Sequence, residues 1–107
     1  MSRVDEGAAP LFAAMGDPTR LNLVRRMGSG KPHSITELTK GLSLTRQGVT
    51  KHLQVLENAG VVRSERVGRT KQFTYVPDSI QPLQTYLDTV SAQWDEALSR
   101  LKAHVES

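Results

Sequence analysis

The middle of the chain carries a helical segment whose two faces differ in chemistry. Between Thr45 and Gly60, the apolar residues Val49, Leu53 and Leu56 recur at helical spacing. At about 100° per residue, these three fall on one narrow stripe. The opposite face and its flank carry side chains that form hydrogen bonds, with no carboxylate among them: Gln47, Thr50, Lys51, Gln54 and Asn58. This outer face is suited to binding another molecule through directional hydrogen bonds.

The chemistry of this face matches the edges of base pairs. Glutamine pairs bidentately with adenine, and lysine donates to the acceptors of guanine or to a phosphate. Arg46 lies in the first turn, where a recognition helix usually meets base edges or the backbone. The alternative is an ordinary solvated helix face, but such faces usually mix acids with bases, and Glu57 is the only acid between Thr45 and Gly60. We therefore predict that a helix over about 45–59 binds double-stranded DNA.

A basic hairpin is predicted directly after this helix. Residues 61–67 and 71–76 suit two strands, and Gly68, Arg69 and Thr70 suit the turn between them. The cations of the hairpin flank this turn, and Glu65 is the acid among them: Arg63, Arg66, Arg69 and Lys71. Such a wing, over about 62–76, contacts the DNA backbone or enters the minor groove. The alternative is that exposed arginines only prevent edge-to-edge aggregation. Beside the amide-rich helix, the DNA interpretation is favoured.

The remaining elements must position the helix and the hairpin. Asp17 before Pro18 predicts a capped helix start, and Leu21, Val24 and Met27 are expected to face the core. Ser34 with Glu37 predicts a capping box for a short helix, Thr45 caps the next helix, and Gly60 ends it in a left-handed conformation. The expected order is helix, helix, helix, helix, strand, strand, long helix. The fold class is therefore mainly α with a small β-hairpin (α+β), a winged helix-turn-helix.

Composition limits the class of protein. The chain has 107 residues, no cysteine and a net charge of +3, and it has no apolar run long enough to cross a bilayer. We expect a flexible tail over residues 1–7, a single domain over 8–107, and a cytoplasmic location without membrane contact. The three histidines are scattered and there is no glycine-rich phosphate loop, so we expect no catalysis and no cofactor.

A long helix over about 80–104 carries an apolar stripe. Its members follow one another at alternating steps of three and four residues, which is the spacing of a two-helix seam: Leu83, Leu87, Val90, Trp94, Ala97, Leu101 and His104. The stripe exceeds what one small core covers, so we predict pairing with a second copy, with Trp94 as the anchor. The alternatives are that the stripe packs on its own domain, or that Trp94 lines an effector pocket.

Three segments together resemble the ArsR-type transcriptional repressors. The run from Asp17 to Leu21 resembles the D-P-T-R-L opening of that family, residues 50–62 resemble the S-x-H-L-x-x-L-x-x-A-G-L-V signature, and Arg69 to Tyr75 resembles the G-R-x-x-x-Y wing. The resemblance implies a homodimeric repressor that binds an inverted repeat. It also implies a dimer formed through the first helix (about 8–15) and the last, with these contacts: Leu11, Phe12, Leu87, Val90, Trp94 and Leu101.

The chain departs from the metal-sensing members of that family. It has Ser34, Ile35 and Thr36 where those members carry paired cysteines, and Val90 and Leu101 stand where imidazoles would be needed. We therefore expect no metal site, because zinc needs three or four ligands. The last helix over 93–102 looks more like the SdpR-like branch, whose members often control their own expression. His52, which matches the family's histidine, falls beside the apolar stripe, so we predict a packed or backbone-bonding side chain rather than a base contact.

Two other functions remain open from the residues alone. A winged helix can be a protein-interaction module whose basic face meets an acidic partner, although protein docking favours aromatic residues and the chain has only five. A regulator of this kind can also respond to a small molecule other than a metal. Nothing in the sequence identifies such an effector.

Overall fold

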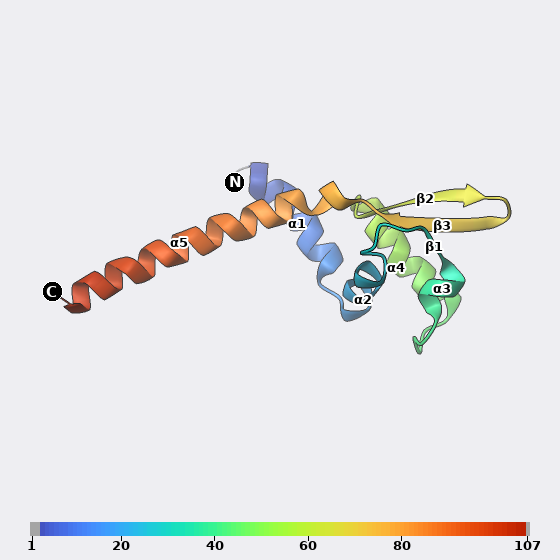
Figure 1. The fold of residues 1–107 in the computed structure, drawn as a ribbon, viewed down its shortest axis with the longest axis horizontal. Helices are drawn as coiled ribbons and strands as arrows, with labels where there is room; N and C mark the ends of the chain where they lie inside the picture. Colours follow the sequence, from blue (N-terminus) through green and yellow to red (C-terminus); the bar gives the residue numbers. More distant parts are fainter. Residues whose placement is uncertain (1–2, 107) are drawn as a thin grey trace.

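The computed structural model describes residues 3–106 of the chain, and the side chains of residues 6–106. Helices and a small sheet form a body from which one long helix projects (Figure 1). In chain order the elements are α1 (Arg3–Met15), α2 (Pro18–Arg26), β1 (His33–Ser34), α3 (Ile35–Thr39), α4 (Arg46–Asn58), β2 (Val62–Val67), β3 (Thr70–Tyr75), the 3-10 helix η1 (Pro77–Ile80) and α5 (Gln81–Glu106). Two short helices joined by a turn, α3 and α4, are followed directly by a hairpin, as predicted.

Side-chain caps begin the middle helices where the sequence predicts them. The backbone N–H of Arg20 donates to the Asp17 carboxylate at 3.0 Å, and Pro18 occupies the first turn of α2. Ser34 and Glu37 form the capping box of α3. At α4, the backbone N–H of Gly48 donates to the Thr45 hydroxyl at 3.0 Å. Each cap satisfies an amide that the first helical turn leaves without a partner.

The sheet has three strands in the order β1-β3-β2, all antiparallel. The sequence predicted only the hairpin of β2 and β3. The missed strand, β1, has two residues, of which His33 pairs with Phe73. It is too short for the apolar alternation that marks a strand. Gly68 has a φ of +64° and no other residue type has a positive φ among the described residues, so the hairpin turn fits type II′.

The core lies between the helices and the inner face of the sheet. Its buried members are Leu11, Ala14, Leu23, Met27, Leu38, Val49, Leu53, Leu56, Val61, Val62 and Phe73. The predicted stripe of α4 is confirmed, because Val49, Leu53 and Leu56 are fully buried. The prediction for Leu21 is wrong: this side chain is 50% exposed and Leu23 is fully buried instead.

The first helix begins earlier than predicted. We expected a tail over residues 1–7, whereas α1 begins at Arg3, and only residues 1 and 2 of that tail lie outside the described residues. The physical reason is packing against α5. A Cβ at Gly7 would lie 3.2 Å from the Cβ of Pro82, so the glycine lets the two helices approach closely. Tertiary contact, rather than local propensity, extends this helix.

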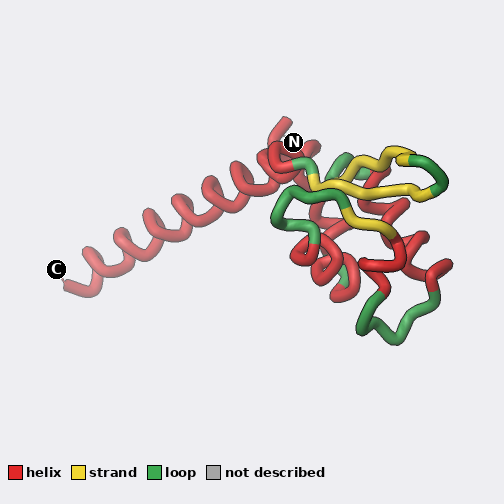
Figure 2. The backbone as a smooth tube through the Cα atoms, turned by 45° about the vertical axis from the view of Figure 1, so that its right-hand side comes forward, coloured by secondary structure: helices red, strands yellow, loops and turns green. Residues whose placement is uncertain are grey.

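The last helix leaves the body of the protein. It has 26 residues, and its N-terminal part lies beside α1 while its C-terminal part has no other element next to it in either view (Figures 1 and 2). The molecule is therefore elongated, with extents of 68 × 29 × 22 Å. None of the described helices combines the length and the apolar character needed to span a membrane.

Candidate nucleic-acid interface

Helix α4 presents its predicted outer face to solvent. All five residues that we predicted to contact DNA from this helix are exposed: Arg46, Gln47, Thr50, Lys51 and Gln54. The Thr50 hydroxyl donates to the carbonyl of Arg46 at 2.8 Å, which leaves its oxygen as an acceptor toward solvent. The side-chain amide of Gln54 donates from Nε2 to the side-chain Oδ1 of Asn58 at 2.9 Å, so the two amides form one ordered polar surface.

The wing divides its cations between two faces. Arg66 pairs with Lys71 across the hairpin, and Ser64 pairs with the buried Phe73. Side chains two residues apart on a strand point to the same face of the sheet, and so do residues paired across the hairpin. Arg66 and Lys71 therefore lie on the same face as Phe73, toward the helices. The ammonium of Lys71 lies 5.4 Å from the centre of the Phe73 ring, which agrees with this assignment. Therefore only some of the cations of the hairpin lie on the face of the wing that is turned toward the helices.

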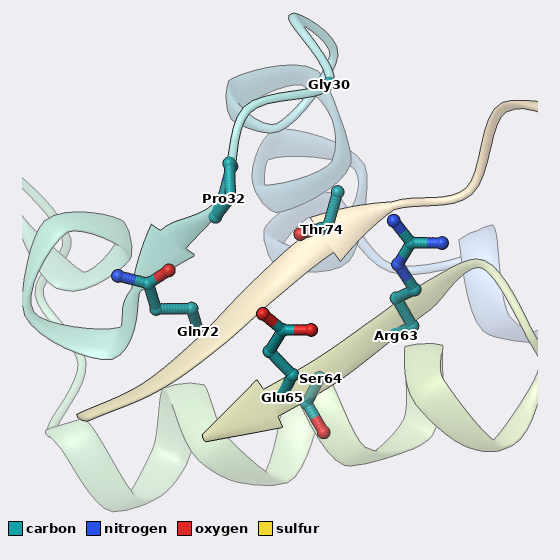
Figure 3. A pocket seen from close by; sticks show the side chains of 7 residues that line it. All are labelled: Gly30, Pro32, Arg63, Ser64, Glu65, Gln72 and Thr74. Atoms are coloured by element: carbon teal, nitrogen blue, oxygen red, sulfur yellow. The ribbon is translucent and has the colours of Figure 1, made fainter. Parts of the chain in front are cut away.

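The opposite face of the wing carries Arg63 and Glu65. Figure 3 shows both side chains at a small hollow of about 140 Å³, with Gln72 and Thr74 from β3 beside them. The hollow has one cation and one anion, so it does not select for negatively charged DNA. Arg63, which we had grouped with the other cations of the hairpin, lies away from the side that α4 shares with Arg66 and Lys71.

A groove of about 400 Å³ connects the start of α4 with the turn of the wing. Its lining residues come from β1, α3, α4 and the hairpin: Ser34, Ile35, Thr36, Arg46, Arg69, Thr70 and Lys71. Three of them are cations and none is an acid, so the groove is strongly positive. Arginine and lysine in this arrangement suit the phosphates of a DNA strand that passes between the helix and the wing. The sequence did not predict that Ser34 and Thr36 lie here.

His52 lies on the inner flank of α4, beside the start of α2. Its Nδ1 atom is 3.1 Å from Nη1 of Arg20 and 3.8 Å from the Asp17 carboxylate, and its side chain is 24% exposed. The prediction of a packed histidine is confirmed. The backbone N–H of Arg20, which donates to the Asp17 carboxylate, lowers the pKa of Asp17 below its ordinary value; burial opposes this effect, and the positive charge of Arg20 adds to it.

The predicted dimer contacts fall into two groups. Leu11 is only 4% exposed and belongs to the core of its own chain, so it has little surface to offer a partner. The others remain at the surface: Phe12 is 42% exposed, Leu87 50%, Trp94 65% and Leu101 58%, while Val90 is partly buried. Among residues 6–106, no three His, Asp or Glu side chains gather closely enough to hold a metal ion.

A helix-turn-helix, a hairpin wing and a basic groove between them define a winged helix-turn-helix protein. Residues 15–65 match the family model described as a helix-turn-helix domain. The chain is 34% identical over 79 residues to YuzN, an HTH-type transcriptional regulator of Bacillus subtilis. The matched part is 68% of this chain and 86% of the relative.

Solved structures agree with these matches. An ArsR-like transcriptional regulator from Rhodococcus sp. RHA1 has a TM-score of 0.77 and 29% identity, over 94% of each chain. A homodimeric winged helix-turn-helix DNA-binding domain from Mycobacterium bovis has a TM-score of 0.64 over 86% of this chain and 84% of its own, at 16% identity. The chain belongs to the ArsR-type winged helix-turn-helix transcriptional regulators.

Proposed function

We propose that this regulator is a homodimeric repressor that binds an inverted-repeat operator. The observation that carries the proposal is the acid-free groove where Arg46 of α4 meets Arg69 and Lys71 of the wing. With α4 in the major groove, a phosphate strand would run through this groove. The protein then acts by occupying DNA, as a binding protein rather than an enzyme.

In this proposal, one group of residues reads the bases and another group contacts the phosphates. Gln47 and Gln54 read adenine edges, and Lys51 reads guanine or contacts a phosphate, with Thr50 at the flank. The remaining cations hold the backbone and fix the register: Arg46, Arg66, Arg69 and Lys71. Base contacts therefore come from the middle of α4, and phosphate contacts come from its start and from the wing.

The exposed stripe of α5 supports the homodimer. Leu87, Trp94 and Leu101 are each at least half exposed, although they are large apolar side chains. A continuous apolar stripe of this kind marks an interaction site. The Mycobacterium bovis domain of the same fold is homodimeric. A two-fold dimer would place its recognition helices about 34 Å apart, one turn of DNA, and would therefore read an inverted repeat.

Footprinting tests the proposal directly. The full-length protein is incubated with its own upstream region and with genomic fragments at near-physiological salt, with random duplex as competitor. We expect a protected stretch that contains two inverted half-sites about one helical turn apart. No preference for any genomic fragment over random duplex would refute sequence-specific binding.

Transcription in vitro from the protected promoter tests repression separately. We expect transcript levels to fall as the protein is added, in proportion to the occupancy of the site. Binding accompanied by more transcript would retain the DNA-binding function but contradict the repressor. Binding to other promoters and not to its own would exclude control of its own expression, which the resemblance to the SdpR-like branch implies.

A further inference from the structure

One arginine side chain contacts two helices besides its own. Arg20 of α2 lies at the spacing of Leu23, Val24 and Met27, that is, on the side of the helix that faces the core. Its Nε donates to the carbonyl of Ala14 at 2.5 Å and its Nη2 to the carbonyl of Ala13 at 3.4 Å, while Nη1 lies 3.1 Å from His52 Nδ1. All three guanidinium nitrogens are engaged.

The groups that Arg20 contacts on α1 and on α4 both favour one fixed arrangement of its side chain. Ala13 and Ala14 lie in the last turn of α1, where carbonyls point out of the helix end and a cation is favoured; the Ala13 carbonyl also accepts from the Gly16 N–H at 3.4 Å. A guanidinium only donates, so His52 Nδ1 is the acceptor in this contact. The planar fork of arginine holds several acceptors in one geometry, whereas the single ammonium of lysine does not. The Arg20 side chain therefore fixes the orientation of α4 relative to α1 as well as joining the two helices.

The two helices that Arg20 joins have different tasks under the proposed function. α1 packs against α5, which carries the dimer surface, and α4 carries the base-reading face. We infer that Arg20 is a positioning residue: through His52 it fixes the recognition helix against the dimer scaffold, and so sets the spacing of half-sites that the dimer accepts. This inference rests on the proposed function.

The test measures spacing preference with the full-length protein. The operator found by footprinting is prepared with its native spacer and with spacers altered by one and two base pairs, and affinities are read by fluorescence anisotropy. Because a geometric error in either α4 misplaces all of its base contacts, wild type should prefer the native spacer by about tenfold or more. Arg20→Gln and Arg20→Lys should both lose most of this preference.

Variants of His52 test the same contact from α4. His52→Asn keeps an acceptor and should retain the spacing preference, whereas His52→Leu removes the acceptor and should lose it. His52→Leu leaves the bonds of Arg20 to α1 in place, so it decides the matter if Arg20→Gln does not fold. In each folded variant, the dimer fraction and the affinity for a single half-site should stay within about twofold of wild type, because those surfaces are unchanged.

Two results would overturn the inference. In one, folded Arg20→Gln and His52→Leu keep the wild-type preference for the native spacer. In the other, affinity for a single half-site falls as much as affinity for the full operator, which indicates a general loss of structure. If wild type binds no operator at all, the proposed function fails, and the inference fails with it.

Discussion

The ring of Phe12 in α1 meets the ring of Tyr86 in α5 edge to face, with centroids 5.5 Å apart and planes at 83°. Aromatic pairs favour this geometry because the positive edge of one ring faces the negative face of the other. Phe12 nevertheless keeps 42% of its surface exposed. The pair therefore fastens α1 to α5 and leaves part of the Phe12 ring exposed on the surface that these two helices form.

Replacing Trp94 should weaken the dimer. Trp94→Ala removes the largest exposed apolar side chain of the α5 stripe, and truncation of a tryptophan anchor typically costs about 2 kcal/mol or more. We expect sedimentation to show a shift toward monomer. Gln93→Ala is the control, since it is a neighbouring exposed residue off the stripe. An unchanged dimer in Trp94→Ala would remove this residue as the anchor.

Replacing an outer-face glutamine should relax sequence preference. Gln47→Ala or Gln54→Ala should each lose about 1–3 kcal/mol of discrimination at one operator position, because a bidentate contact to adenine is lost. Competition with operators that carry single base changes measures this loss. Gln93→Ala again serves as the control. If every position loses discrimination equally, the glutamine does not read a base.

Arg69 at the turn of the wing and Arg63 on the face away from α4 provide a matched pair for salt dependence. Arg69→Ala should lower affinity for all DNA and reduce the slope of log affinity against log salt by about 0.9, the value for one lost phosphate contact. Arg63→Ala removes the same charge from outside the groove and should leave the slope unchanged. Titrations between low and physiological salt give both slopes. Equal effects of the two changes would show that total charge, not the groove, controls binding.

Stability should depend on the ionisation of Asp17. Its pKa is lowered in the folded chain, so the ionised carboxylate stabilises the fold at pH values above its ordinary pKa of 3.8. That stabilisation is lost as the pH falls through the lower folded value. Asp17→Asn retains an oxygen that accepts from the Arg20 N–H but does not titrate. The urea midpoint of this variant should therefore fall less than that of wild type between pH 6 and pH 3, and equal losses would contradict the assignment.

The sequence predicted those parts of the fold that depend on local signals. The apolar stripe of α4, the caps at Asp17, Ser34 and Thr45, and the left-handed Gly60 all follow from residues a few positions apart. These signals failed in α2. Arg20 occupies a core-facing position because backbone carbonyls and His52 form hydrogen bonds with its guanidinium. A prediction based on apolar residues alone therefore placed Leu21, rather than Leu23, on the buried face.

The sequence predicted only part of the candidate site, because it indicates local structure but not how the elements pack. The exposed face of α4 follows from helical period, whereas the groove depends on how α3, α4 and the wing pack. No local signal brings Thr36 near Arg69. The face of the wing on which Lys71 lies could have been predicted from the sequence, since Lys71 and Phe73 are two residues apart on one strand. Assigning Arg63 and Arg66 to faces required the pairing register as well.

The projecting half of α5 links assembly to folding. Its described ion pairs, Arg100 with Glu96 at 2.8 Å and Lys102 with Glu106 at 3.9 Å, are well exposed and contribute only about 0.3–0.5 kcal/mol each. Helical stability in proteins comes mostly from the packing of an apolar face rather than from local propensity. The end of α5 should therefore gain stability when a second copy covers its apolar side. Copy number in the cell would then control the fraction of paired chains, and with it how steeply promoter occupancy rises with protein concentration.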